Sequence, residues 1–127
     1  MRAEVFLDTA YAIALSSSTD LFHQRAVQLA DELKSAGTRL VTTRAILLEI
    51  GNALSRQRYR RAAVMLLDSL ETDPRVEIIP LSEQLYTRAS WLYRERPDKE
   101  WALTNCVSFV AMEDRGAPRW ACTPYRT

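Results

Sequence analysis

The sequence predicts an α/β protein, in which a short parallel sheet is covered by helices on both faces. Three short apolar segments, at residues 3–8, 38–43 and 75–80, have the length and composition of buried strands. Segments with helical periodicity separate them, and this alternation is typical of parallel sheets. The chain of 127 residues has the length of one compact domain.

Six helices are expected from apolar residues at helical spacing and from residues that begin or end helices. Asp20 can cap the second helix, and Thr43 can cap the third. Ser82 or Glu83 can begin the fifth helix, and Pro97 ends it. The expected helices cover residues 9–16, 21–36, 44–57, 60–73, 83–96 and 103–115.

The charge and the cysteine content exclude several classes of protein. The chain has 17 Lys and Arg residues against 16 Asp and Glu residues, a formal net charge of +1. Any contact with nucleic acid must therefore use a local basic patch. The single histidine, His23, argues against zinc enzymes with paired histidines and against two-histidine nucleases. Cys106 and Cys122 form no CxxC pair, which predicts buried free thiols.

The amino-terminal segment and the distribution of apolar residues predict a cytoplasmic protein. No apolar run approaches the ~18 residues that are needed to span a membrane. Glu4 and Asp8 stand where a secretion signal would need an apolar core.

Three acidic residues are candidates for a metal site. Asp8 follows the first strand, and sheets of this kind bind ligands at the carboxyl ends of their strands. Asp8 could therefore hold a divalent cation, or it could cap the helix that follows. Glu49 lies in a polar stripe on an otherwise apolar helix, where it could bind a cation or pair with an arginine such as Arg56. Asp98, in the polar loop before the last helix, is a ligand or a solvated acid.

A neutral residue, Asn105, occupies the start of the last helix in the stretch WALTNCVSF. One interpretation is structural, since Asn is a good helix cap. The other is chemical, because an amide oxygen can bind a hard cation, although it brings no charge. We therefore expect Asn105 either to close the helix end or to orient a substrate phosphate or a metal-bound water.

A local basic patch is present in the stretch SRQRYRR. Arg56, Arg58 and Arg60 could contact RNA phosphates, and Tyr59 could stack on a base. The same residues could instead form a solvated, charged turn.

Three segments, in this order, resemble the PIN-domain nucleases, and most of all the VapC-type toxins of bacterial toxin–antitoxin pairs. The segments read FLDTAYAIALSSSTDLFHQRA, LLEIGNALS and RPDKEWALTNCVSF, and the resemblance covers residues 5 to about 116. It implies a PIN-like α/β/α sandwich over residues 1–127 and hydrolysis of RNA that depends on Mg²⁺ or Mn²⁺.

The resemblance also assigns the family's acidic residues to positions of this chain. Its first acid falls on Asp8 and its second on Glu49. The third belongs at Asn105, and Tyr125 takes the place of a fourth, which makes residues 117–127 atypical of the family. Two lost carboxylates should weaken metal binding steeply, because each charge at ~4 Å is worth roughly several kcal/mol.

Two functions follow from this resemblance. One is a metal-dependent endoribonuclease, with Asp8, Glu49 and Asn105 as catalytic residues and with Asp8, Glu49 and Asp98 around the metal. The other is a weakened or inactive PIN-fold module that binds RNA or an antitoxin. The expected partners are RNA, a cognate antitoxin protein and a second copy of the chain in a homodimer, and no membrane is involved. In related toxins the region after the Glu49 helix commonly contacts the antitoxin or the second subunit.

Overall fold

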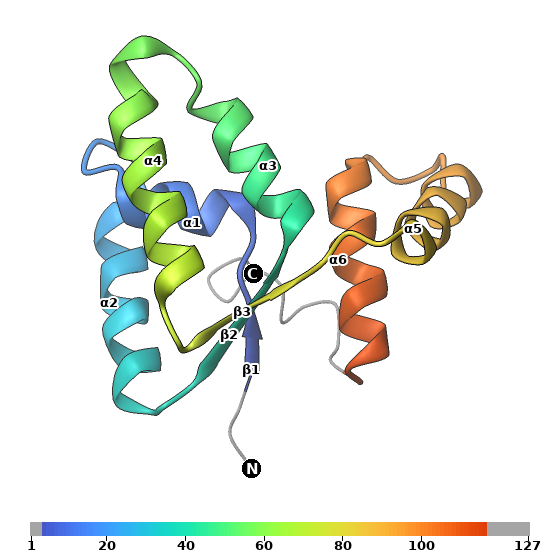
Figure 1. The fold of residues 1–127 in the computed structure, drawn as a ribbon, viewed down its shortest axis with the longest axis horizontal. Helices are drawn as coiled ribbons and strands as arrows, with labels where there is room; N and C mark the ends of the chain where they lie inside the picture. Colours follow the sequence, from blue (N-terminus) through green and yellow to red (C-terminus); the bar gives the residue numbers. More distant parts are fainter. Residues whose placement is uncertain (1–3, 117–127) are drawn as a thin grey trace.

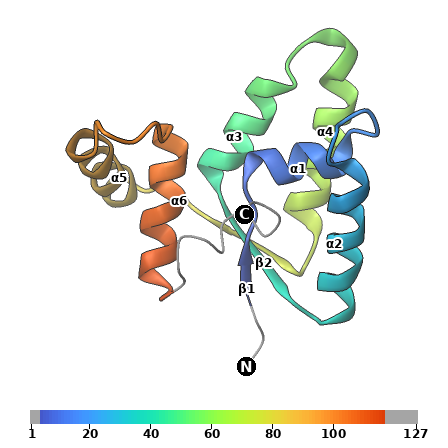
Figure 2. The same ribbon diagram turned by 180° about the vertical axis from the view of Figure 1, so that it is seen from behind.

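Three parallel strands form the centre of the molecule and helices cover both faces, as a computed structural model of residues 4–116 shows. Figure 1 shows α1 to α4 on one side of the sheet and α5 and α6 on the other, and Figure 2 shows the same layers from behind. The predicted α/β sandwich is thereby confirmed. The strands are β1 (Glu4–Phe6), β2 (Arg39–Thr43) and β3 (Val76–Ile79). The helices are α1 (Thr9–Ser16), α2 (His23–Ser35), α3 (Arg44–Ala53), α4 (Gln57–Thr72), α5 (Glu83–Glu95) and α6 (Leu103–Asp114).

The sheet has the order β1-β2-β3, with β2 in the centre. Val5 is paired with Leu40, and Leu40 with Val76, so all three strands run in the same direction. The ladder continues beyond β1, where the Leu7 amide donates to the Val41 carbonyl at 2.8 Å. Because the strands are parallel, their carboxyl ends meet at one end of the sheet, where α1 and α3 begin.

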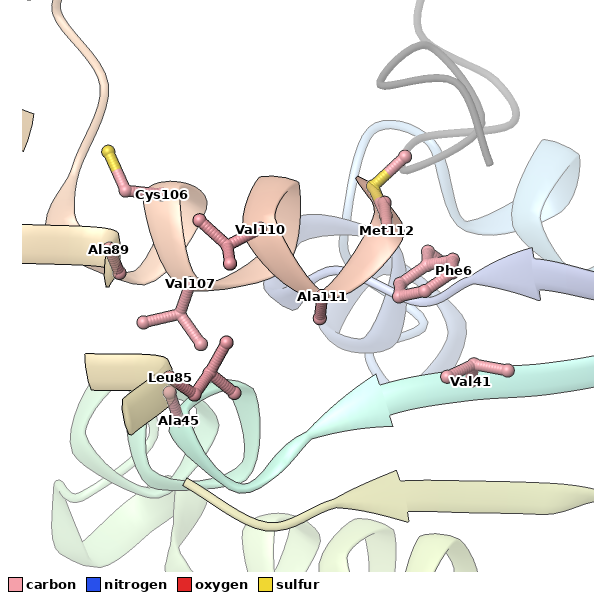
Figure 3. Close-up of a cluster of buried hydrophobic side chains, with 10 residues drawn as sticks. All are labelled: Phe6, Val41, Ala45, Leu85, Ala89, Cys106, Val107, Val110, Ala111 and Met112. Atoms are coloured by element: carbon pink, nitrogen blue, oxygen red, sulfur yellow. The ribbon is translucent and has the colours of Figure 1, made fainter. Parts of the chain in front are cut away.

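Each face of the sheet has its own hydrophobic core. Phe6 and Leu7 belong to different cores, since consecutive residues of an extended chain point to opposite faces. Figure 3 shows the core on the α5 and α6 side, where side chains of α6 approach Phe6 and Val41. Its buried members are Phe6, Val41, Ala45, Leu85, Ala89, Cys106, Val107, Val110, Ala111 and Met112. The opposite core holds Leu7, Tyr11, Ala12, Ala14, Ala26, Ile46, Leu47, Ile50, Leu66 and Leu70.

Side-chain caps fix where several helices begin. The Thr43 hydroxyl accepts from the Ile46 amide, and the Ser82 hydroxyl accepts from the Leu85 amide, which confirms both predicted caps. The cap predicted at Asp20 is wrong, because α2 begins only at His23. Asp20 instead accepts from the amide two residues ahead at 2.9 Å, and this turn delays the helix.

The boundary between α3 and α4 differs from the prediction. The apolar periodicity predicted helices over 44–57 and 60–73, but α3 ends at Ala53 and α4 begins at Gln57. The turn between them contains neither Gly nor Pro, the residues that most strongly mark a turn in a sequence. By contrast, Gly37 has a φ of 68° just beyond α2, the left-handed conformation that commonly follows a helix end.

Ion pairs cross the amino end of the sheet, opposite the end where α1 and α3 begin. Arg115, just after α6, pairs with Glu4 of β1 at 3.0 Å and also with Glu77 of β3. Arg39 of β2 lies 3.5 Å from Glu77. The predicted burial of Cys106 is confirmed, and Cys122 lies outside the described residues. Between residues 4 and 116, no helix has the length and apolar composition to cross a membrane.

Candidate active site

Asp8 lies two residues beyond β1, at the carboxyl end of the sheet, and only 3% of its surface is exposed. Its Oδ1 accepts from the Tyr11 amide at 2.9 Å, so the residue caps α1. A buried carboxylate needs such partners, and the helix N-terminus also contributes a partial positive charge. The structural role predicted for Asp8 is therefore confirmed, and it orients a charged group at the end of the sheet where ligands bind in parallel folds.

Glu49 lies in the second turn of α3 and is half-buried. None of the ion pairs between described residues includes it, so the alternative pairing with Arg56 is not observed. Glu49 lines a hollow of about 230 Å³ between α3, the segment around the start of α5, and the start of α6. The hollow is lined by Ala45, Leu48, Glu49, Asn52, Leu81, Tyr86, Leu103, Thr104 and Val107. Glu49 thus lines a recess, and no ion pair among the described residues engages its carboxylate.

Asn105 lies in the first turn of α6, next to Thr104 of the hollow. Its Oδ1 accepts from the Ala102 amide at 2.9 Å, which confirms the capping interpretation, although Ala102 rather than Asn105 is the residue at the N-cap. An amide side chain has one oxygen and two N–H donors. The capping bond occupies one of the two lone pairs of that oxygen, and no hydrogen bond among the described residues uses the two N–H donors, which suit a phosphate.

Asp98 lies in the loop before α6 and forms two hydrogen bonds with Arg96, both at 2.9 Å. The side-chain hydrogen bonds from Arg96 lower the pKa of Asp98 to about 2. Arg96 also lies over the ring of Trp101, which packs edge-on against Phe109 with ring centroids 5.0 Å apart. These contacts hold the loop that leads into α6. To bind a metal, Asp98 would have to exchange Arg96 for the ion, and its metal role stays a prediction.

The residues at this end of the sheet fit a hydrated cation better than a closed metal cage. No group of three or more His, Cys, Asp and Glu side chains able to hold a metal occurs within residues 4–116. Mg²⁺ often keeps several waters and is held by one or two carboxylates together with substrate phosphates. Asp8 and Glu49 are the two carboxylates that could hold such an ion, and this role stays a prediction. Beside Asp8, the Thr9 hydroxyl is buried without a hydrogen-bond partner in the described part of the chain, and a metal-bound water would supply one.

The predicted basic patch lies at the junction of α3 and α4. Arg56, Arg58 and Arg60 are all exposed, and no ion pair among the described residues engages them. The Arg58 guanidinium lies 4.7 Å from the Tyr59 ring centroid, and Arg60 donates to the Ser55 carbonyl at 2.7 Å. Three positive charges are therefore available to an anionic partner, and their contact with RNA stays a prediction.

Sequence reasoning missed Thr9 and the residues that face Glu49 across the hollow. Tyr86 lies in the first turn of α5, and Leu81 precedes that helix. A signal was available, because both follow the carboxyl end of a predicted strand within a few residues. Tyr125 and the atypical segment 117–127 lie outside the described residues.

The comparison with known families agrees with this architecture. The PIN domain family matches the chain over residues 5–108, which is most of its length. The chain therefore belongs to the PIN domain family, as the resemblance of its three segments implied.

One similar solved structure is the toxin VapC20 of Mycobacterium tuberculosis, which is described as cleaving the sarcin-ricin loop. The two folds superpose with a TM-score of 0.79, over 88% of this chain and 83% of that chain, at 22% sequence identity. At that identity, the likeness establishes the shared fold alone. No curated protein matches the chain.

Proposed function

We propose that the protein is a divalent-metal-dependent endoribonuclease of the VapC-toxin type, which hydrolyses RNA phosphodiesters at the carboxyl end of its sheet. One observation supports the proposal: the buried, capped carboxylate of Asp8 lies at the carboxyl end of the sheet of a PIN domain, and α3, which begins at the same end, carries Glu49. The RNA-cleaving activity named for VapC20 supports RNA as the substrate class.

Asp8 and Glu49 are the residues that would hold Mg²⁺ or Mn²⁺, with Asp98 as a third acid if it leaves Arg96. When bound, such an ion neutralises phosphate charge and lowers the pKa of its bound water.

The remaining residues act by orientation and attraction. The hydrogen bond from Tyr11 fixes the Asp8 carboxylate, so its charge needs no reorganisation when RNA binds. The Asn105 amide group, whose oxygen is already bonded, directs N–H donors to a phosphate oxygen. Arg56 and Arg58 attract the RNA backbone from the α3–α4 junction.

The test is RNA cleavage by the wild type and Asp8→Asn, with Mn²⁺ present. Asparagine keeps the oxygen that caps α1 and removes the charge, so the fold should persist. We expect the rate to fall about 100-fold or more, because even residues that only support metal ligands cost 10–100-fold. The matched control is Asp31→Asn, which removes an exposed acid on α2 and should leave the rate unchanged. Equal rates for the wild type and Asp8→Asn would contradict the proposal.

A second candidate function is a PIN-fold binding module that no longer cleaves RNA. The committed oxygen of Asn105 and the absence of a three-acid group within residues 4–116 favour it. Such a module would hold RNA, a cognate antitoxin protein or a second copy of the chain. RNA that binds the wild type and stays intact with Mn²⁺ would support this function over the first, and sedimentation would measure the proposed homodimer.

A further inference from the structure

The hollow beside Glu49 combines an exposed aromatic ring with apolar walls. Tyr86 is 46% exposed and forms part of its lining. Leu48, Leu81, Leu103 and Val107 supply apolar side chains around it. Leu48 is 64% exposed, so its apolar side chain at the hollow is accessible to a ligand.

The size of the hollow limits what can fill it. Its volume is about 230 Å³. A water occupies roughly 30 Å³ of the liquid and drug-sized pockets begin near ~300 Å³, so this hollow suits a single flat ring system. A stable contact with a second copy would need about 800 Å² on each partner, which a recess of this size does not supply by itself.

The polar residues of the hollow suit the edge of a ring that both donates and accepts hydrogen bonds. Asn52 has an amide with a donor and an acceptor, and Thr104 has a hydroxyl. Within residues 4–116, no hydrogen bond or ion pair engages either side chain. Unpaired RNA bases are recognised in this way, by stacking on aromatic rings and by hydrogen bonds to their edges.

We infer that the hollow is a base-recognition pocket, which takes one unpaired nucleobase of RNA next to the phosphate at Asp8 and Glu49. Tyr86 stacks on the base, and Asn52 bonds to its edge. The inference rests on the proposed function, since that function puts the scissile phosphate beside Glu49. It adds the feature of the substrate that the protein selects: an accessible, unstacked base beside the cleaved bond.

Binding of abasic RNA tests this inference without cleavage. Fluorescence anisotropy in EDTA would compare a short single-stranded RNA with versions that lack one base at successive positions. For the wild type, we expect removal of the base at one position to weaken binding about tenfold or more, the usual effect of losing one base–aromatic stack. Tyr86→Ala should bind the intact RNA about tenfold more weakly and should be insensitive to the missing base. Asn52→Ala should keep the effect of the missing base, because stacking on Tyr86 is unchanged. With RNAs that carry each of the four bases at that position, it should discriminate less between them than the wild type.

The matched control is Tyr93→Ala. Tyr93 is a tyrosine on the same helix with a similar exposure, 49%, and it does not line the hollow. This variant should keep the wild-type sensitivity to the missing base. Circular dichroism of each variant would establish that it is folded.

Three results would overturn the inference. The first is an abasic effect of the same size in Tyr86→Ala and in the wild type. The second is a change of oligomeric state in Tyr86→Ala with no change in RNA binding, which would assign the hollow to a second copy. The third is an absence of RNA binding.

A parallel cleavage assay in Mn²⁺ separates this inference from the proposed function. If RNA is cleaved but the missing base has no effect on binding, the base pocket is contradicted and the hydrolytic function stands. If the missing base weakens binding but RNA is not cleaved, the hydrolytic function is contradicted and the pocket stands. If RNA is neither bound nor cleaved, both are contradicted.

Discussion

The resemblance to the PIN-domain nucleases implies an acid at the position of Asn105, whose amide replaces one carboxylate oxygen with nitrogen. The capping bond to the Ala102 amide uses the only oxygen of the Asn105 side chain. An aspartate could make the same bond with one oxygen and turn the second to a metal. An amide at this position therefore keeps the helix end capped without the charge of a carboxylate. We expect an intact fold together with weaker metal binding.

The ion pair between Asp98 and Arg96 predicts a distinct pH dependence. Hydrogen bonds from Arg96 lower the pKa of Asp98 to about 2, so its carboxyl should remain mostly ionised at about pH 3, where an ordinary Asp with a pKa of ~3.9 is mostly protonated. The contribution of the pair to folding is then present above about pH 4 and is lost as the pH falls towards ~2. Carboxyl ¹³C NMR would measure the titration. In Arg96→Ala the midpoint should return to its ordinary range, and an unchanged midpoint would refute the assignment.

At the scale of the element, α3 determines where Glu49 lies. The buried Thr43 caps the first turn of α3. The fully buried Ile50 packs the second turn into the core that α3 shares with α1 and α4. Glu49 directly precedes Ile50 in the helix, so the burial of Ile50 determines which face of α3 carries Glu49. The polar stripe in the sequence predicted this arrangement, because helical spacing is regular. The turn after Ala53 was missed because nothing in the sequence interrupts the helical pattern there.

Substitutions on the buried and exposed faces of α4 should change the free energy of unfolding by very different amounts. Leu66 is 8% exposed and packs in the core with α1 and α3, whereas Met65 is 62% exposed. Leu66→Ala should lower the free energy of unfolding by about 2–5 kcal/mol, because it leaves a cavity. Met65→Ala, its matched control, should change that free energy by less than about 0.5 kcal/mol. Urea denaturation measures both, and similar losses would show that α4 is packed differently.

At the scale of the whole molecule, a group of ion pairs and the candidate site lie at opposite ends of the sheet. Its amino end is closed by the ion pairs of Arg115 with Glu4 and Glu77. Its carboxyl end carries Asp8, and the helix that follows β2 carries Glu49. Because the net charge is only +1, we expect any attraction of RNA to come from a local group of arginines such as Arg56, Arg58 and Arg60.

The salt dependence of RNA binding tests the basic patch. Removal of Arg56, Arg58 and Arg60 together should reduce the slope of log affinity against log salt by about 2, since each phosphate contact to single-stranded RNA contributes ~0.7. Arg94→Ala, an exposed arginine of α5 outside the patch, should change it by less than one such contact. An unchanged slope in the triple variant would show that these arginines form a solvated turn.

Much of the fold could be predicted from the sequence, whereas the site could be predicted only in part. Short apolar strands between amphipathic helices predict the sheet, and strand ends predict where Asp8 lies. The partners of individual side chains are different, because they depend on the exact geometry of loops and on how distant segments pack. The sequence offered capping by Asn105 as one of two interpretations. The pairing of Asp98 with Arg96 and the place of Tyr86 beside Glu49 in the hollow are seen only in the structure.

The most direct test of the account is the rate of RNA cleavage against Mn²⁺ concentration for the wild type, Asp8→Asn and Asn105→Asp. We expect the wild type to require a high Mn²⁺ concentration. Asn105→Asp should reach its half-maximal rate at about one tenth of the Mn²⁺ concentration that the wild type needs, or below that, since one added carboxylate strengthens metal binding. Asp8→Asn should stay about 100-fold or more slower than the wild type throughout. Cleavage that is independent of Mn²⁺, or that survives the loss of the Asp8 charge, would contradict a metal site built on Asp8 and Glu49.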